Sequence, residues 1–97
     1  MRESTVETLL VNCVEEFGGL AYKVKIIGRT GFNDRLVILP QWPRAWIAVV
    51  ELKAPGKKPR RTQELRHEEM RKRRVRVYVI DDEPGVRKLI DDFVDER

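Results

Sequence analysis

Cysteine, histidine and long apolar runs are all scarce in this sequence. Its 97 residues include one cysteine, Cys13, and one histidine, His67. A single cysteine excludes an internal disulfide, and the position of Cys13 on the apolar side of a predicted helix indicates a core residue rather than a nucleophile. No apolar run approaches the length of a membrane span, and Arg2, Glu3 and Glu7 interrupt the N-terminus where a signal peptide would be apolar. We therefore expect a cytoplasmic protein with no membrane partner.

Charge is abundant by contrast, and it is unevenly placed. Charged residues make up 37% of the chain and hydrophobic residues 41%, which is enough for one core in a single domain spanning residues 1–97. Residues 53–76 hold eleven basic and three acidic side chains, whereas residues 77–97 hold three basic and seven acidic ones. The basic middle segment predicts a polyanionic partner.

Hydrophobic periodicity predicts seven secondary-structure elements. Apolar residues at helical spacing indicate a first helix over 5–17, and Pro84 opens a last helix with the same spacing. Strands are predicted at 21–27, 35–40, 45–52 and 75–80, and a more polar helix at 63–73. The order α-β-β-β-α-β-α predicts an α/β fold with a mixed central sheet flanked by helices.

Two carboxylates and a lysine stand at the ends of the second and third predicted strands. If these strands form an antiparallel hairpin around residues 41–44, Asp34 lies directly opposite Glu51, and Lys53 shares the face of Glu51 because side chains alternate along a strand. Carboxylates on adjacent strands repel each other unless a cation lies between them, and oxygen ligands select Mg²⁺ or Mn²⁺. Lys53 would then orient the attacking water or stabilise charge on a phosphate. The competing interpretation is an exposed cross-strand ion pair.

Glu7, Gln63 and His67 each have two interpretations. Glu7 forms a capping box with Ser4, or it reaches toward the sheet from the edge of the buried helix face. Gln63 is an ordinary first-turn residue after a cap at Thr62, or its amide holds a water or a phosphate oxygen. His67 follows four residues later on the same helix face, where it contacts substrate or is simply solvated.

The basic segment begins with a loop beside the predicted site. This loop contains two prolines and a glycine and leads into the polar helix, so its cations are well placed to contact phosphates. These loop cations are Lys57, Lys58, Arg60 and Arg61. The basic residues at 71–74 end the helix, where positive charge also favours the helix dipole. Of the two tryptophans, Trp46 is expected to pack on the sheet and Trp42 to be exposed at the hairpin loop.

Taken in order, these residues resemble the pattern of the virus-type replication–repair nuclease domain, VRR-NUC, of the PD-(D/E)XK superfamily. The resemblance covers about residues 3–90 and implies a restriction-endonuclease-like core. As a short stand-alone domain, this chain resembles the phage and viral members of the family. One departure is Asn33, where the family usually has proline. The matching segments are Val6-Glu7, Gly18-Gly19, Lys23, Gly31-x-x-Asp34-Arg35, Val50-Glu51-Leu52-Lys53-Ala54-Pro55-Gly56 and Gln63-x-x-x-His67.

The resemblance implies a metal-dependent DNA endonuclease with Mg²⁺ or Mn²⁺ as its cofactor. By matching positions, Asp34 and Glu51 would be metal ligands, with the backbone carbonyl of Leu52 as a third. Glu7 would be the acid of the first helix, either behind the metal ligands or in contact with the metal through a water. The resemblance therefore favours the sheet-directed interpretation of Glu7 over the cap.

Further site residues follow from the same resemblance. Lys53 would be the catalytic lysine, and Gln63 would be the glutamine beside the site. The small viral members imply a homodimer that acts on branched DNA such as Holliday junctions. Residues expected to contact DNA are Lys23, Arg35, Lys57, Lys58, Arg60, Arg61 and His67.

Two other functions compete with a structure-selective endonuclease. A non-catalytic nucleic-acid-binding module would keep the basic segment, but it would not need the set Asp34, Glu51 and Lys53. A restriction-like duplex nuclease would need a sequence-reading element, and this short chain offers no obvious one. The sequence therefore favours the structure-selective enzyme.

Overall fold

The protein folds around a four-stranded mixed sheet, in the element order that the sequence predicts. The computed structural model describes residues 2–24 and 34–97. The fold class and the order α-β-β-β-α-β-α are confirmed. The helices are α1 (Glu3–Glu16), α2 (Arg61–Lys72) and α3 (Glu83–Asp95), and the strands are β1 (Leu20–Val24), β2 (Asp34–Leu39), β3 (Trp46–Leu52) and β4 (Arg76–Ile80).

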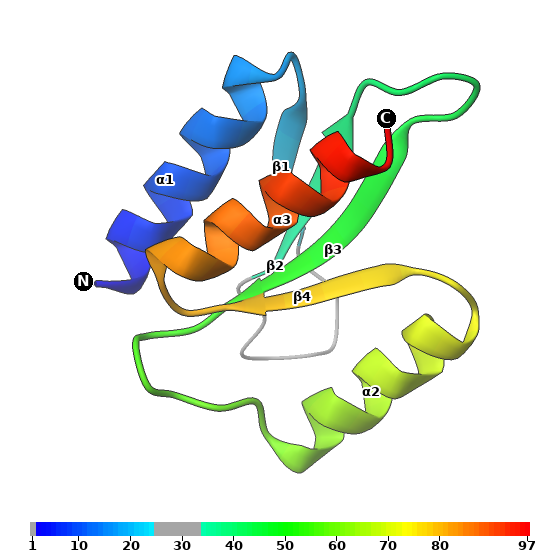
Figure 1. Ribbon diagram of the computed structural model, residues 1–97. Coiled ribbons are helices and arrows are strands. Elements are labelled where there is room, and N and C mark those ends of the chain that lie inside the picture. The colour runs from blue at the N-terminus through cyan, green and yellow to red at the C-terminus, as the bar shows by residue number, and fades with distance from the viewer. Residues whose placement is uncertain (1, 25–33) are drawn as a thin grey trace.

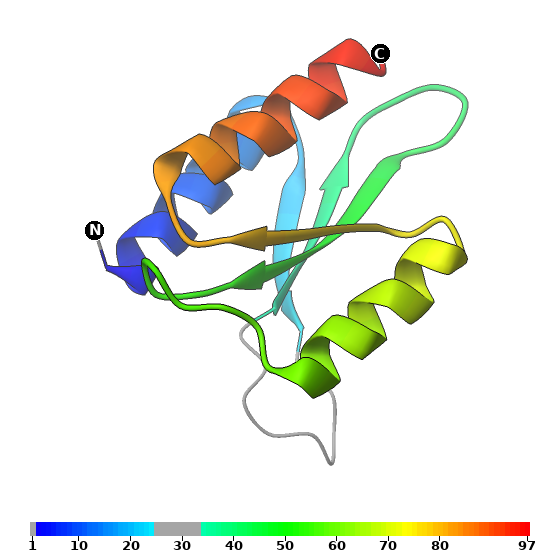
Figure 2. The same cartoon turned by 60° about the horizontal axis from the view of Figure 1, so that its bottom comes forward.

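The strands of the described residues lie in the order β1-β2-β3-β4. The pairs β1–β2 and β2–β3 are antiparallel, whereas β4 is parallel to β3. A parallel pair needs a crossover connection, and α2 supplies it. Figures 1 and 2 show α1 and α3 together over one face of the sheet, with α2 beside β4 on the other side.

The hydrophobic core lies between the sheet and the pair of helices α1 and α3. Alternate residues of β3 point into it, from Trp46 at one end to Leu52 at the other, and both are almost completely buried. The Trp46 ring packs edge-on against Phe93 of α3, with 5.8 Å between ring centroids. Because α2 covers only part of the opposite face, that face keeps half-exposed residues such as Ile47 and carries the polar side chains described below.

Helix capping differs from the sequence prediction at two of the three helices. Arg2 is the N-cap of α1, so Ser4 lies inside the first turn and the predicted Ser4–Glu7 capping box is absent. Arg60 is the N-cap of α2, so the predicted cap at Thr62 is also wrong. The backbone is extended at Arg2 and at Arg60, as is usual for an N-cap, and neither helix start has a side-chain cap hydrogen bond.

The two tryptophans differ as expected, since Trp46 is fully buried and Trp42 is 91% exposed. Within residues 2–24 and 34–97, no helix combines the length and the apolar character that a membrane crossing requires. The predicted strand residues 25–27 and the motif residues Gly31 and Asn33 lie outside the described residues.

Candidate active site

Asp34 and Glu51 are directly opposed on β2 and β3. The hairpin places Leu39 opposite Trp46, and the same register continues to the Asp34–Glu51 pair, which confirms the predicted pairing. Both side chains are buried, with 5% of Asp34 and 1% of Glu51 exposed. Because the flanking residues of β3 point into the core, Glu51 points to the face where α2 lies. The two carboxylates therefore share that face.

Burying two neighbouring carboxylates is electrostatically unfavourable. Oδ1 of Asp34 and both carboxylate oxygens of Glu51 are buried without a hydrogen-bond partner among the described residues. Burial, and then the charge of Glu51, raise the pKa of Asp34 to about 6. Burial also raises the pKa of Glu51. Unpartnered buried oxygens of this kind are what a bound cation would satisfy.

The donor set fits a hard divalent cation held by few protein ligands. In the described part of the chain, no group of three or more His, Cys, Asp or Glu is arranged to hold a metal ion. Mg²⁺ is commonly bound by one or two carboxylates, with waters and substrate phosphates in its other positions. The Asp34–Glu51 pair matches that pattern rather than an all-protein cage.

Lys53 directly follows β3, and its backbone N–H donates to the carbonyl of Ile80 at 3.0 Å. This hydrogen bond continues the β3–β4 pairing one residue past Leu52. Strand alternation therefore places Lys53 on the same face as Glu51. Its positive charge opposes the upward pKa shift of both Asp34 and Glu51. Lys53 thus supplies positive charge directly beside the carboxylate pair.

Helix α2 covers the carboxylate pair, and its residue His67 lies against Glu51. His67 is 3% exposed, so the prediction of a solvated histidine is wrong, and direct contact with DNA does not suit its position. Its Nε2 lies 3.8 Å from Oε2 of Glu51. Burial, and then the charge of Arg71, lower the pKa of His67, so the imidazole is neutral at neutral pH and the contact is not an ion pair. His67 therefore packs behind Glu51.

Gln63 is also buried, at 7% exposure, on the side of α2 that faces the sheet. Its Oε1 accepts a hydrogen bond from the backbone N–H of Arg60 at 2.8 Å. This contact closes the first turn of α2 and matches the structural interpretation of the residue. A contact with substrate would have to come from the amide nitrogen.

Glu7 and Arg35 pair with each other on the opposite face of the sheet. The distance between Arg35 Nε and Glu7 Oε2 is 3.0 Å, and Arg35 Nη1 donates to the Ala21 carbonyl at 2.8 Å. Arg35 follows Asp34 in β2 and pairs with Lys23, so both basic side chains point away from the face of the carboxylate pair. Arg35 is thus bound within the protein rather than presented to DNA, and Glu7 does not join Asp34 and Glu51 in one cluster.

Arg66 is a site residue that the sequence analysis did not single out. Its charge lowers the pKa of Asp34 and of Glu51, and it lines a cavity of about 160 Å³ with Asp34, Val49 and Met70. The available signal was its helical spacing, because residue 66 lies one turn after Gln63 on the side of α2 that faces the sheet. The sequence does not show which of eleven basic residues in that segment folds inward.

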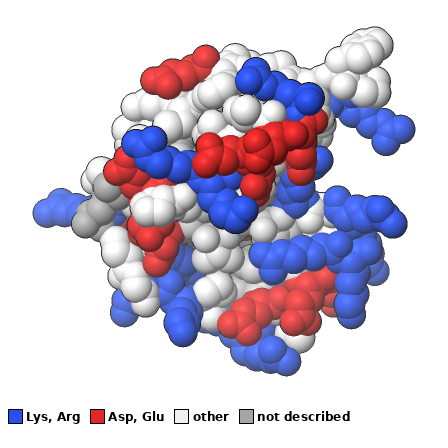
Figure 3. Space-filling model, in the orientation of Figure 1, with Lys and Arg blue, Asp and Glu red and all other residues white. Residues whose placement is uncertain are grey.

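The remaining predicted DNA contacts are on the surface. Lys57 and Lys58 are exposed in the loop after β3, and the backbone N–H of Gly56 in that loop donates to Oδ2 of Asp81 at 3.2 Å. Arg60 and Arg61 are exposed at the start of α2. Figure 3 shows acidic side chains over α3, whereas over α2 basic side chains surround a smaller acidic group.

Known proteins were compared with this chain in sequence and in structure. No protein-family model matches the chain. Over 59 residues it is 49% identical to the protein called "Putative nuclease p44" of Acyrthosiphon pisum secondary endosymbiont phage 1. That segment is 61% of this chain and spans only 60% of the length of the phage protein. A solved structure described as "VRR_NUC domain" superposes with a TM-score of 0.78 at 39% identity, over 92% of this chain and 94% of that one.

Proposed function

The chain belongs to the VRR-NUC family, and from this premise we propose that it is a metal-dependent DNA endonuclease. The observation that carries the proposal is the buried Asp34–Glu51 pair, in which Asp34 Oδ1 and both carboxylate oxygens of Glu51 lack hydrogen-bond partners among the described residues. A binding module would gain nothing from two neighbouring buried carboxylates, which cost stability. The nuclease name of the phage relative points in the same direction.

Asp34 and Glu51 would hold Mg²⁺ or Mn²⁺, with the Leu52 carbonyl as a further ligand. When bound, such a cation polarises the phosphoryl group and lowers the pKa of a coordinated water. The protein's own contribution is to position charge. Lys53 places an ammonium group beside the carboxylates, where it stabilises negative charge that develops on the phosphate. His67, which is buried against Glu51, excludes water from that side of the carboxylate.

The scissile phosphate would be presented by basic side chains of the segment that joins β3 to α2. Lys57 and Lys58 lie in the loop after β3, and Arg60 and Arg61 follow at the start of α2. Contacts between basic side chains and phosphates fix the position of the nucleic acid and read no sequence. A site served by phosphate contacts alone would recognise the shape of DNA rather than its sequence. We therefore extend the proposal to branched DNA, cut by a homodimer that presents two sites related by symmetry.

A cleavage assay tests this function directly. A four-way junction and a linear duplex of the same sequence are incubated with the protein and Mn²⁺ or Mg²⁺, beside the Glu51→Gln variant. We expect metal-dependent nicks in the junction, slower cutting of the duplex, and no cutting by the variant. Tight binding of both DNAs without cleavage would instead indicate a binding module. Equal cleavage of junction and duplex would contradict the structural selectivity.

A stability–affinity trade-off is expected at Arg74, just after α2. Arg74 has φ +65°, a conformation that costs a residue other than glycine about 1 kcal/mol. Its N–H donates to the Arg71 carbonyl, and the next N–H donates to the Met70 carbonyl, which is the helix ending that glycine favours. We expect Arg74→Gly to raise the melting temperature by about 4–8 °C and to lower DNA affinity several-fold.

Thermal denaturation and DNA titrations at two salt concentrations check this expectation. The loss of one phosphate contact should reduce the salt dependence of binding by about one unit of slope. The matched control is Arg74→Lys, which keeps both the charge and the strained backbone and should change neither quantity much. Unchanged affinity in a more stable Arg74→Gly protein would show that the arginine does not contact DNA.

A further inference from the structure

Trp42 is the most exposed large apolar side chain in the described residues, with 91% of its surface accessible. It lies in the loop between β2 and β3, four residues before the fully buried Trp46. A tryptophan contributes 150–250 Å² of burial when it is packed, so leaving one in solvent forgoes a large stabilisation. Tryptophan is also the residue type most enriched among side chains that dominate protein interfaces. Its exposure therefore needs an explanation.

The loop that carries Trp42 is tied to the rest of the molecule. Nε2 of the preceding residue, Gln41, donates to the backbone carbonyl of Glu96 at 2.9 Å, just beyond α3. The indole N–H of Trp46 also donates to the Glu96 carboxylate. A tethered loop loses little conformational entropy when its tip binds a partner. Trp42 is thus presented in advance, together with the exposed guanidinium of Arg44.

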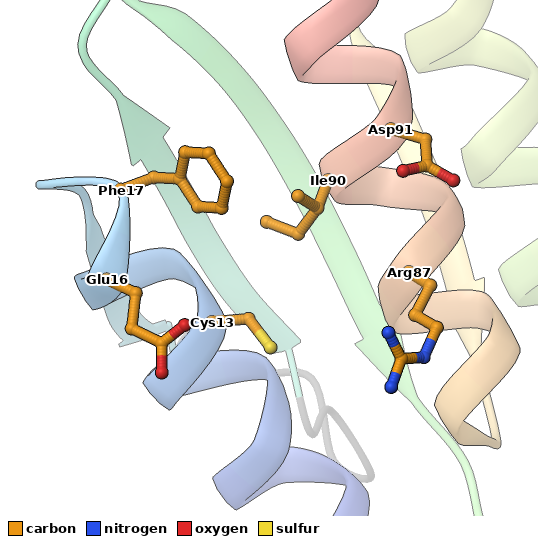
Figure 4. A pocket seen from close by; sticks show the side chains of 6 residues that line it. All are labelled: Cys13, Glu16, Phe17, Arg87, Ile90 and Asp91. Atoms are coloured by element: carbon orange, nitrogen blue, oxygen red, sulfur yellow. The ribbon is translucent and has the colours of Figure 1, made fainter.

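A groove that could receive such a side chain lies between α1 and α3. Its volume is about 280 Å³, and Figure 4 shows Phe17 and Ile90 pointing toward one another across it, with Cys13 beside them. Pockets for drug-sized ligands span about 300–1,000 Å³, so this groove suits a single side chain better than a small molecule. Burial, and then the nearby charge of Glu16, raise the pKa of Cys13, which keeps the thiol neutral and the groove floor apolar.

The rim of the groove carries a surplus of negative charge. Arg87 is paired with Glu83, with 3.0 Å between Nε and Oε1. Glu16 and Asp91 form no ion pair with any residue that the structure describes. An acidic rim repels nucleic acid but complements a guanidinium placed beside an aromatic ring. The loop at 40–45 offers that combination in Trp42 and Arg44.

We propose that Trp42 of one copy of this chain inserts into the groove between α1 and α3 of a second copy. Arg44 then lies against the free carboxylates of Glu16 and Asp91. Reciprocal insertion gives a closed two-fold dimer in which each copy both donates and receives a tryptophan. The inference rests on the homodimer within the proposed function and names its interface. It requires neither metal nor DNA.

Association of the full chain without DNA or metal tests the interface. Light scattering after size-exclusion chromatography and sedimentation should show a wild-type dimer, and Trp42→Ala should raise its dissociation constant by about 10²-fold or more. Leu20→Ala is the matched control, because Leu20 is also an exposed apolar residue, at 47%, on the edge strand β1. This control should leave the dimer intact. Loss of the dimer in Leu20→Ala but not in Trp42→Ala would place the interface on β1 and overturn the proposal.

Thiol labelling reports on the groove itself. Cys13 is the only cysteine, so a maleimide modifies one site per chain. In the wild-type dimer the inserted indole should slow labelling at least 10-fold relative to Trp42→Ala.

A charge exchange tests the contact between Arg44 and the acidic rim. Arg44→Glu should weaken the dimer, and adding Asp91→Arg in the same chain should restore part of the loss. Equal labelling rates, or a monomeric wild type at every concentration, would refute the proposal without bearing on cleavage.

Discussion

DNA cleavage by the Lys53→Ala variant is expected to be about 10²–10³-fold slower than by the wild-type chain at saturating Mn²⁺. Lys53 lies beside two buried carboxylates, and its charge already acts on both of them. Stabilising charge that appears only in the transition state raises the rate constant for cleavage, whereas DNA affinity depends on many phosphate contacts. The loss should therefore appear in the rate measured with excess enzyme, with little change in the DNA dissociation constant.

The matched control for this experiment is Lys57→Ala. Lys57 is also a lysine of the segment after β3, but it is exposed in the loop. It should lower DNA affinity modestly and leave the cleavage rate of bound DNA within a few-fold of the wild type. If Lys57→Ala slowed cleavage as much as Lys53→Ala, general electrostatic attraction would explain both results. A fully active Lys53→Ala protein would remove Lys53 from the catalytic machinery.

Without metal, Asp34→Asn is expected to be more stable than the wild type at pH 8, by on the order of 2 kcal/mol. Burial and the charge of Glu51 raise the pKa of Asp34 from 3.8 to about 6 in the folded protein. Below pH 3.8 the carboxyl is protonated in the folded and the unfolded chain, so its charge costs nothing. As pH rises toward 6 the unfolded chain loses this proton first, and the wild type loses stability relative to the variant.

Thermal denaturation between pH 4 and pH 8 measures this difference. The variant should melt about 10 °C higher at pH 8 in a chelator, and the gap should close toward pH 4. Saturating Mn²⁺ should stabilise the wild type by about 2–3 kcal/mol and the variant much less. Asp95→Asn, a control at an exposed carboxylate outside the proposed dimer contact, should show neither effect. A wild type that gains stability between pH 4 and pH 6 relative to Asp34→Asn would contradict the unpaired buried charge.

The sequence predicted the parts of the site that depend on strand alternation and on turn length. The Asp34–Glu51 pairing follows from a short hairpin loop and a period of two, and both are local properties of the chain. The same logic placed Trp46 in the core and Trp42 in solvent. Local rules were sufficient because the hairpin brings together residues that are close in sequence.

The sequence could not predict which polar side chains tertiary packing would redirect. Glu7 pairs with Arg35 across 28 residues, and nothing in either local segment favours that contact over a helix cap. His67 and Arg66 turn inward because α2 crosses from β3 to β4 over the carboxylates, a docking that depends on the whole fold. Only the spacing from Gln63 indicated a shared helix face, and spacing alone does not reveal which side of a polar helix is covered.

The uneven distribution of charge also gives the molecule an electric dipole. Acidic residues concentrate in and around α3, and basic residues in the loop and helix beside the site. As the protein diffuses toward a DNA strand, the field of the phosphates exerts a torque that turns the basic side forward before contact. This orientation acts over roughly one Debye length, about 8 Å at physiological ionic strength. Encounters therefore begin with the site already facing the backbone, which shortens the rotational search after collision.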